Sequence, residues 1–137
     1  MSIIDIRTMR YINLLDRVSK VKTRRCFDYN NTIIFAVPAR LVSKAIGNNA
    51  ANVRILQEQL GKRIRIVKEA ESLADLERFT RDIIAPVGFK SVELQEDCVV
   101  INAGNTNKAA LIGRNKRRLD ELALIIKDVF DKSLKII

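Results

Sequence analysis

Apolar and polar residues along this chain follow the periods of helices and strands, in an order that occurs twice. Near the start, Ile12, Leu15 and Val18 recur every third residue, which predicts a helix over residues 9–19. The other elements predicted in the first half are strands at 26–28 and 32–37, a helix from Pro38 to Ile46, a second helix at 52–60 and a strand at 63–67. An Asn30-Asn31 pair between the two first strands is typical of a tight hairpin.

The second half repeats this order after an acidic connector. Ser72 and Asp75 have the spacing of a helix-capping pair, and they begin a predicted connector helix over residues 72–84. The elements predicted after this helix are strands at 89–94 and 98–103, a short helix at 108–112, a longer helix at 117–130 and a final strand at 134–137.

The two halves match at a constant offset of 66 residues. The matched positions include Ile33 with Val99, Phe35 with Ile101, Ile46-Gly47 with Ile112-Gly113, Asn49 with Asn115, Val53 with Leu119 and Leu56 with Leu122. Such self-similarity indicates one supersecondary unit used twice. We therefore predict an α+β fold with two domains, residues 1–70 and 71–137, each a three-stranded sheet packed on helices.

Composition excludes several chemistries. The 137 residues contain no histidine, which removes Ser-His-Asp and Cys-His nucleophiles and imidazole metal sites. Cys26 and Cys98 are too few and too far apart for a cysteine-rich zinc site. Asp5, Arg7 and Arg10 interrupt the apolar start, unlike a signal peptide, and no uncharged stretch approaches the ~18–20 residues of a membrane helix. We expect a soluble cytoplasmic protein that is not an enzyme and binds no metal or cofactor.

Charge is distributed unevenly along the chain. It holds 25 Lys+Arg against 16 Asp+Glu, a net charge of +9. Residues 38–67 carry six basic and one acidic side chain and residues 101–137 carry eight and four, whereas residues 68–100 carry four and eight. Two basic blocks separated by an acidic one are what two similar surfaces for a polyanion would show. The alternative is a surface laced with salt bridges.

A loop in the same place in each half is the candidate for binding chemistry. A short helix ends in Ile-Gly, two polar residues follow, and a second helix begins. The start of a helix presents unpaired N–H groups and a positive dipole end, and a residue without Cβ lets a phosphate approach closely. An ordinary helix–turn–helix connection is the alternative, which the duplication inside basic blocks disfavours.

The segments around these loops resemble a known family. The stretches AIGNNAANVRILQEQLGKRIRIV and ALIGRNKRRLDELALIIKDVF are similar to paired type II KH domains. With IIFAVP, and with IIAP before VGFKSVEL, the chain looks like the short archaeal NusA family of transcription elongation and termination factors. The resemblance implies two tandem type II KH domains of the α/β sandwich type. Each would clamp about four nucleotides of single-stranded RNA with a Gly-x-x-Gly loop.

The family's loop maps onto this chain with one departure in each half. The first glycine falls on Gly47 and Gly113, and the two variable positions fall on Asn48-Asn49 and Arg114-Asn115. The last glycine is replaced by Ala50 in the first loop and by Lys116 in the second. We expect the alanine to keep a helical φ, and the charge of the lysine to replace a close backbone contact.

The predicted RNA-binding residues are the two loops and their neighbours. They are Lys44, Ile46, Gly47, Asn48, Asn49, Ala50, Arg54, Arg63, Arg65, Lys108, Ile112, Gly113, Arg114, Asn115, Lys116, Arg117 and Arg118. Arg63 and Arg65 are expected at the edge of an RNA groove, or else on a solvated strand face. Ile46, Val53 and Ile64 are expected to line the groove that selects bases in the first half.

Aromatic residues offer few stacking positions. Four phenylalanines at apolar-periodic positions are expected in the core: Phe35, Phe79, Phe89 and Phe130. Only Tyr11 and Tyr29 remain as candidates to stack on a base, and the aromatic platform of an RRM is absent.

The leading hypothesis is a monomeric RNA-binding transcription factor that contacts nascent single-stranded RNA at RNA polymerase through both loops. The alternative is a KH-fold protein-interaction module with degenerate loops, which docks on RNA polymerase or a ribosomal partner. An enzyme is disfavoured, because no histidine and no recognisable nucleophile constellation are present.

Overall fold

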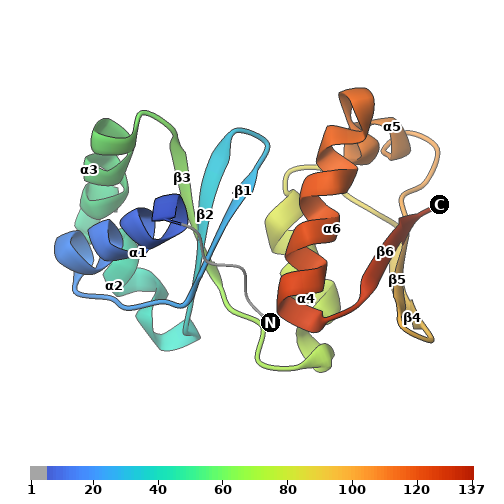
Figure 1. Cartoon of the computed structure of the whole chain (residues 1–137), viewed down its shortest axis with the longest axis horizontal. Helices are drawn as coiled ribbons and strands as arrows, with labels where there is room; N and C mark the ends of the chain where they lie inside the picture. The colour runs from blue at the N-terminus through green and yellow to red at the C-terminus, as the bar shows by residue number, and fades with distance from the viewer. Residues whose placement is uncertain (1–5) are drawn as a thin grey trace. The chain divides into compact units, whose positions relative to one another are not determined.

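Two compact units make up the chain (Figure 1). A computed structural model describes residues 6–137, so residues 1–5, which include Asp5 and begin the first predicted domain, lie outside the described residues. The described parts of the units are residues 6–69, the N-terminal unit, and residues 70–137, the C-terminal unit. Each unit has the order helix, strand, strand, helix, helix, strand, as the sequence pattern predicts.

The N-terminal unit closely follows the predicted elements. Its elements are α1 (Ile6–Ser19), β1 (Arg25–Tyr29), β2 (Thr32–Val37), α2 (Val42–Ile46), α3 (Ala51–Leu60) and β3 (Arg63–Lys68). The helix predicted from Pro38 to Ile46 is instead a 3₁₀ turn at Ala39–Leu41 followed by α2. A second 3₁₀ turn, Asn48–Ala50, joins α2 to α3.

The sheet of this unit has the order β1-β2-β3. Strands β1 and β2 are antiparallel and are joined through Asn30 and Asn31, whose positive φ values of 52° and 57° are those of a tight hairpin turn. Strands β2 and β3 are parallel, which requires the crossover that α2 and α3 supply.

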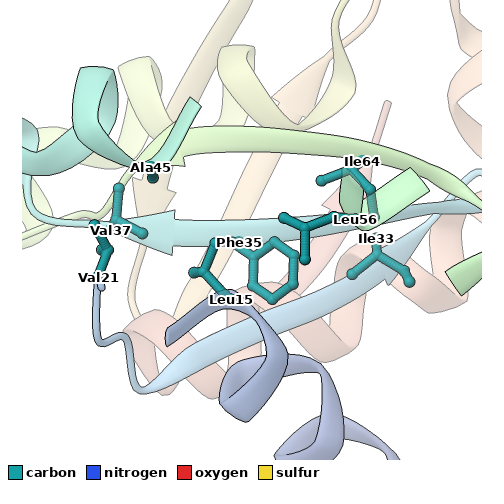
Figure 2. Packing of buried hydrophobic residues seen from close by; sticks show 8 residues of the cluster. All are labelled: Leu15, Val21, Ile33, Phe35, Val37, Ala45, Leu56 and Ile64. Atoms are coloured by element: carbon teal, nitrogen blue, oxygen red, sulfur yellow. The ribbon is translucent and has the colours of Figure 1, made fainter. Parts of the chain in front are cut away.

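A core between this sheet and its helices fixes the position of the α2–α3 connection (Figure 2). Phe35 of β2 is fully buried and lies beside Leu15 of α1 and Leu56 of α3. Burial of each such side chain stabilises the fold by about 1.5–3 kcal/mol. Ile64 belongs to the same core and is only 5% exposed. The prediction that it lines a base-selecting groove is wrong, because pairing opposite Ile33 turns it toward the helices.

The C-terminal unit repeats the same plan. Its elements are α4 (Leu76–Ile84), β4 (Ser91–Gln95), β5 (Cys98–Asn102), α5 (Lys108–Ile112), α6 (Arg117–Phe130) and β6 (Ser133–Ile136). The predicted connector helix begins with a 3₁₀ turn at Leu73–Asp75, where the Ser72 hydroxyl accepts the Ala74 N–H at 3.2 Å. Strand order β4-β5-β6 again combines an antiparallel and a parallel pair.

The repeat holds at 66 residues through the loop and then shifts by four. Thr32 of β2 pairs with Arg63, whereas Cys98 of β5 pairs with Ser133. The cause is helix α6, which has 14 residues against 10 in α3. Four residues are about one helical turn, so the extra length preserves the face that α6 turns toward its sheet.

Aromatic side chains are absent from the exposed surface of residues 6–137. Phe79 is fully buried, with its ring centroid 5.8 Å from that of half-buried Phe130. The prediction that Phe89 is a core residue is wrong, since it is half-buried under the Arg81 guanidinium at 5.1 Å. Tyr29 is only 5% exposed and Tyr11 packs against the core, so both differ from the predicted base-stacking positions.

Candidate nucleic-acid interface

The loop between α2 and α3 has an unusual backbone (Figure 1). Gly47 has φ 82° and ψ 168°, a conformation essentially restricted to glycine. Asn49 and Ala50 then adopt left-handed conformations, at φ 54° and φ 59°. The turn is closed by the Ala50 N–H, which donates to the Gly47 carbonyl at 3.1 Å. Asn48 and Asn49 are exposed at its tip.

The loop between α5 and α6 adopts the same conformation. Gly113 has φ 77° and ψ 172°, and Asn115 and Lys116 are left-handed at φ 56° and φ 60°. The Lys116 N–H donates to the Gly113 carbonyl at 3.2 Å. In both loops a right-handed residue precedes a left-handed one, a combination that turns successive N–H groups to one side as an anion-binding nest.

Both glycines are required by packing as well as by conformation. A Cβ built on Gly47 would lie 2.9 Å from Cγ and Nδ2 of Asn52 and 3.0 Å from its backbone nitrogen. A Cβ on Gly113 would lie 2.6 Å from Cγ of Arg118 and 3.0 Å from its backbone nitrogen. The start of the following helix is therefore in direct contact with each glycine.

The expectation that Ala50 keeps a helical φ is wrong. It precedes α3 as a left-handed residue, and Lys116 precedes α6 in the same way. A non-glycine side chain in this conformation costs about 1–2 kcal/mol, because Cβ crowds the following carbonyl oxygen. The chain therefore carries backbone strain at the same position of both loops.

Charge distinguishes the two loops. At the first loop, Lys44 is exposed and the Arg54 guanidinium donates a hydrogen bond to the Asn49 carbonyl. That bond directs the charge of Arg54 to the tip of the loop. The tip residues themselves, Asn48 to Ala50, are uncharged.

At the second loop the charges lie within the turn. Arg114 and Lys116 belong to it and are exposed, as is Lys108 before it. Arg118 instead forms an ion pair with Glu121, whose other carboxylate oxygen lies 3.8 Å from Nε of Arg117. Glu121 was not singled out in the sequence, although its spacing of three residues from Arg118 on a helix is typical of an ion pair.

Arg63 and Arg65 lie on the edge strand β3 but not on the side of the helices. They are opposite Thr32 and Ile34 in the parallel ladder, so their side chains project from the sheet face that is turned away from α1, α2 and α3. Arg63 is exposed and Arg65 is half-buried. Of the predicted apolar groove residues, Ile46 and Val53 remain partly accessible beside the loop.

Other kinds of site find no support in residues 6–137. They contain no group of three or more histidine, cysteine, aspartate or glutamate side chains that would hold a metal ion. None of the helices in this range is long and apolar enough to cross a membrane.

Comparison with known proteins adds distant relatives. No family model matches the chain. A "Probable transcription termination protein NusA" of Halococcus morrhuae is 24% identical over 126 residues, which cover 90% of this chain and 88% of that protein. The protein of the same name from Methanocaldococcus jannaschii is 25% identical over 120 residues, which cover 85% of this chain and 64% of that protein.

A solved structure has the same fold. It is described as "Crystal structure of APE1850", with a TM-score of 0.69 and 28% identity over 98% of this chain and 100% of that one. The mixed α and β architecture, with a three-stranded sheet against helices in each unit, is compatible with a KH-type fold. Over most of its length, the chain is distantly similar to archaeal NusA proteins.

Proposed function

We propose that this chain is a non-enzymatic, transcription-associated RNA-binding protein with two tandem type II KH domains. Each domain binds single-stranded RNA at the loop that begins with Gly47 or Gly113. The observation that carries the proposal is the duplicated loop conformation, with a glycine-only backbone and left-handed residues next to a helix start. The names of the two distant relatives support a role in transcription elongation or termination, with RNA polymerase as a partner.

The chemistry of each loop suits a phosphodiester. The absence of a Cβ at the glycine leaves the backbone open to a phosphate oxygen, and the nest of N–H groups supplies donors. The N-terminal end of the next helix adds a partial positive charge. These contacts do not depend on base identity, so the loop positions the strand and neighbouring side chains select the bases.

At the first loop, Asn48 and Asn49 supply amide groups and Arg54 supplies the charge. Lys44 adds a second cation, while Ile46 and Val53 form the accessible apolar surface for a base. At the second loop the corresponding charges come from Arg114 and Lys116 within the turn and from Lys108 and Arg117 beside it.

Two weak sites on one chain bind more tightly than either alone. Once one loop holds the strand, the other meets a neighbouring nucleotide segment at high effective concentration. The short footprint of each KH loop, about four nucleotides, makes such pairing useful. Loss of both loops should therefore reduce affinity far more than loss of one.

The test is a titration of the full chain with a fluorescein-labelled, random-sequence 12-nucleotide RNA at several salt concentrations. We expect affinity to fall steeply with salt, with a slope of about −0.7 for each phosphate neutralised on a single strand. The combined Gly47→Asp and Gly113→Asp variant should lose this binding. Arg114→Ala with Lys116→Ala is a second variant that leaves both glycine backbones intact and should also weaken binding.

A protein-interaction module with inactive loops is the competing function. The specific observation in its favour is the strained alanine and lysine where the family has glycine. Absence of RNA binding by the wild-type chain at low salt would reject the RNA proposal and favour this one.

A further inference from the structure

A groove between α1 and α3 lies apart from the two candidate RNA loops. It has a volume of about 250 Å³ and is lined by Arg10, Asn13, Leu14, Arg17, Gln59 and Leu60. Leu14 and Leu60 form its floor, because both pack against the core of the N-terminal unit. The polar side chains form its rim and are exposed.

Helix α1 extends this groove with an exposed apolar surface. Ile6 is 80% exposed and Met9 is 51% exposed. At 3.6 residues per turn, they share the face of α1 that carries Arg10, Asn13 and Arg17. The surface is therefore apolar and cationic at once, a combination that is uncommon where a helix faces only water.

The two groove arginines differ from most arginines on the helices of this chain. Arg7, Arg78 and Arg81 form ion pairs with carboxylates. Arg10 and Arg17 have no ion-pair partner within residues 6–137. No acidic side chain lines the groove, so its positive charge is not neutralised locally.

The repeat shows that this face of the unit need not be open. The positions 66 residues after the groove residues are Leu76, Phe79, Thr80, Ile83, Ile125 and Ile126. All six are buried, and five of them are apolar. The duplicated positions of the C-terminal unit are thus closed by apolar side chains, whereas the N-terminal unit presents arginines and amides to solvent.

We propose that this groove, with Ile6 and Met9 beside it, is a docking surface for an acidic, amphipathic segment of a partner protein. Arg10 and Arg17 are seven residues apart, about 10 Å along a helix, which matches carboxylates two turns apart on a partner helix. The leucine floor and Met9 would receive apolar side chains between those carboxylates. RNA is disfavoured because no exposed aromatic side chain offers a stacking platform here.

The probe for this proposal is a synthetic 16-residue helical peptide with glutamates at positions i and i+7 and leucines on the face between them. It is titrated into the ¹⁵N-labelled full chain and followed by the backbone amide signals of Arg10, Asn13, Arg17 and Gln59. We expect saturable shifts at these signals. Arg10→Glu with Arg17→Glu should weaken binding about tenfold, since each site exchanges an attraction for a repulsion.

Matched controls separate this site from general charge and from the RNA loops. Lys22→Glu with Arg24→Glu makes the same charge change at exposed positions outside the groove and should alter peptide binding less than about twofold. Circular dichroism verifies that both variants fold. Because the groove is separate from the loops, Arg10→Glu with Arg17→Glu should retain most RNA binding, so failure here and failure of the RNA proposal are distinguishable.

Four results would overturn the docking proposal. They are no shifts at 1 mM peptide, equal binding of a scrambled peptide or of a peptide with lysine for glutamate, groove shifts with the 12-nucleotide RNA but not with the acidic peptide, and groove shifts that depend on protein concentration alone. The third result would assign the groove to RNA, and the fourth would assign it to a second copy of this chain.

Discussion

The two loops share one backbone and differ in chemistry. Gly47 and Gly113 agree within 5° in both φ and ψ, and the left-handed residues that follow agree as closely. Yet the first turn is neutral, with its nearest cation held by Arg54, whereas the second carries Arg114 and Lys116 within the turn. The difference teaches that glycine contacts fix the loop's shape, while its charge is free to vary.

The largest expected effect comes from the feature that the loops share. Gly47→Ala and Gly113→Ala should each lower the free energy of unfolding by about 2 kcal/mol, because both combine a glycine-only conformation with Cβ contacts of 3.0 Å or less. Urea denaturation of the full chain measures this. As a control, Gly61→Ala should cost less, since a Cβ there meets no atom within 4 Å. Wild-type stability in either loop variant would contradict the assigned backbone.

The next effect concerns the charge that distinguishes the loops. Arg114→Asn with Lys116→Ala gives the second loop the side chains of the first and should weaken RNA binding about tenfold at low salt. The salt slope should fall by about 1.4 if each cation meets one phosphate. Fluorescence anisotropy with the 12-nucleotide RNA measures both quantities.

The reciprocal exchange is the matched control for that prediction. Asn48→Arg with Ala50→Lys gives the first loop the charges of the second and should strengthen binding and steepen the slope. Unchanged slopes in both exchanged variants would show that the loop cations do not meet phosphates.

A smaller effect should separate strain from binding. Ala50→Gly and Lys116→Gly each relieve a left-handed non-glycine residue and should raise the free energy of unfolding by about 1 kcal/mol. RNA affinity should be unchanged or improved in Ala50→Gly, because only a methyl group is lost, but reduced in Lys116→Gly. Denaturation and RNA titration of the same samples test both parts. Equal RNA affinities in the two variants would contradict a binding role for the lysine.

The smallest effect lies where the helices after the loops end. Helix α3 is followed by Gly61 at φ 67° and α6 by Asp131 at φ 56°. A hydrogen bond from Lys127, with Nζ 2.8 Å from Oδ1, and the charge of that lysine lower the pKa of Asp131 from its ordinary 3.8. Lys127→Ala should return the pKa toward 3.8, as a carbon-detected NMR titration would show.

The sign of the accompanying stability change follows from the lowered pKa. An aspartate with a lower pKa in the folded state stabilises the fold above its unfolded pKa, and this contribution is lost as the pH falls through the folded pKa. The small stability difference between wild type and Lys127→Ala should therefore be present at neutral pH and vanish in strong acid. A difference that grows in acid would contradict the ion pair.

The amino-acid sequence by itself determined the order of elements, their approximate bounds and the duplication. Hydrophobic period and turn residues act locally, so Asn30-Asn31 and Gly61 specify their turns without distant contacts. Helices α5 and α6 fall on their predicted bounds for this reason. The position of both candidate loops was likewise visible, because Ile-Gly before a helix start recurs 66 residues later.

Only the tertiary structure decided which way the side chains point and what they contact. Strand pairing turned Ile64 into the core and directed Arg63 and Arg65 to the opposite sheet face. The close contact between each loop glycine and the next helix accompanies a left-handed Ala50, against its intrinsic preference. Alternation along a strand and conformational propensity leave such choices open. They are settled by the free energy of packing, which depends on residues far away in the chain.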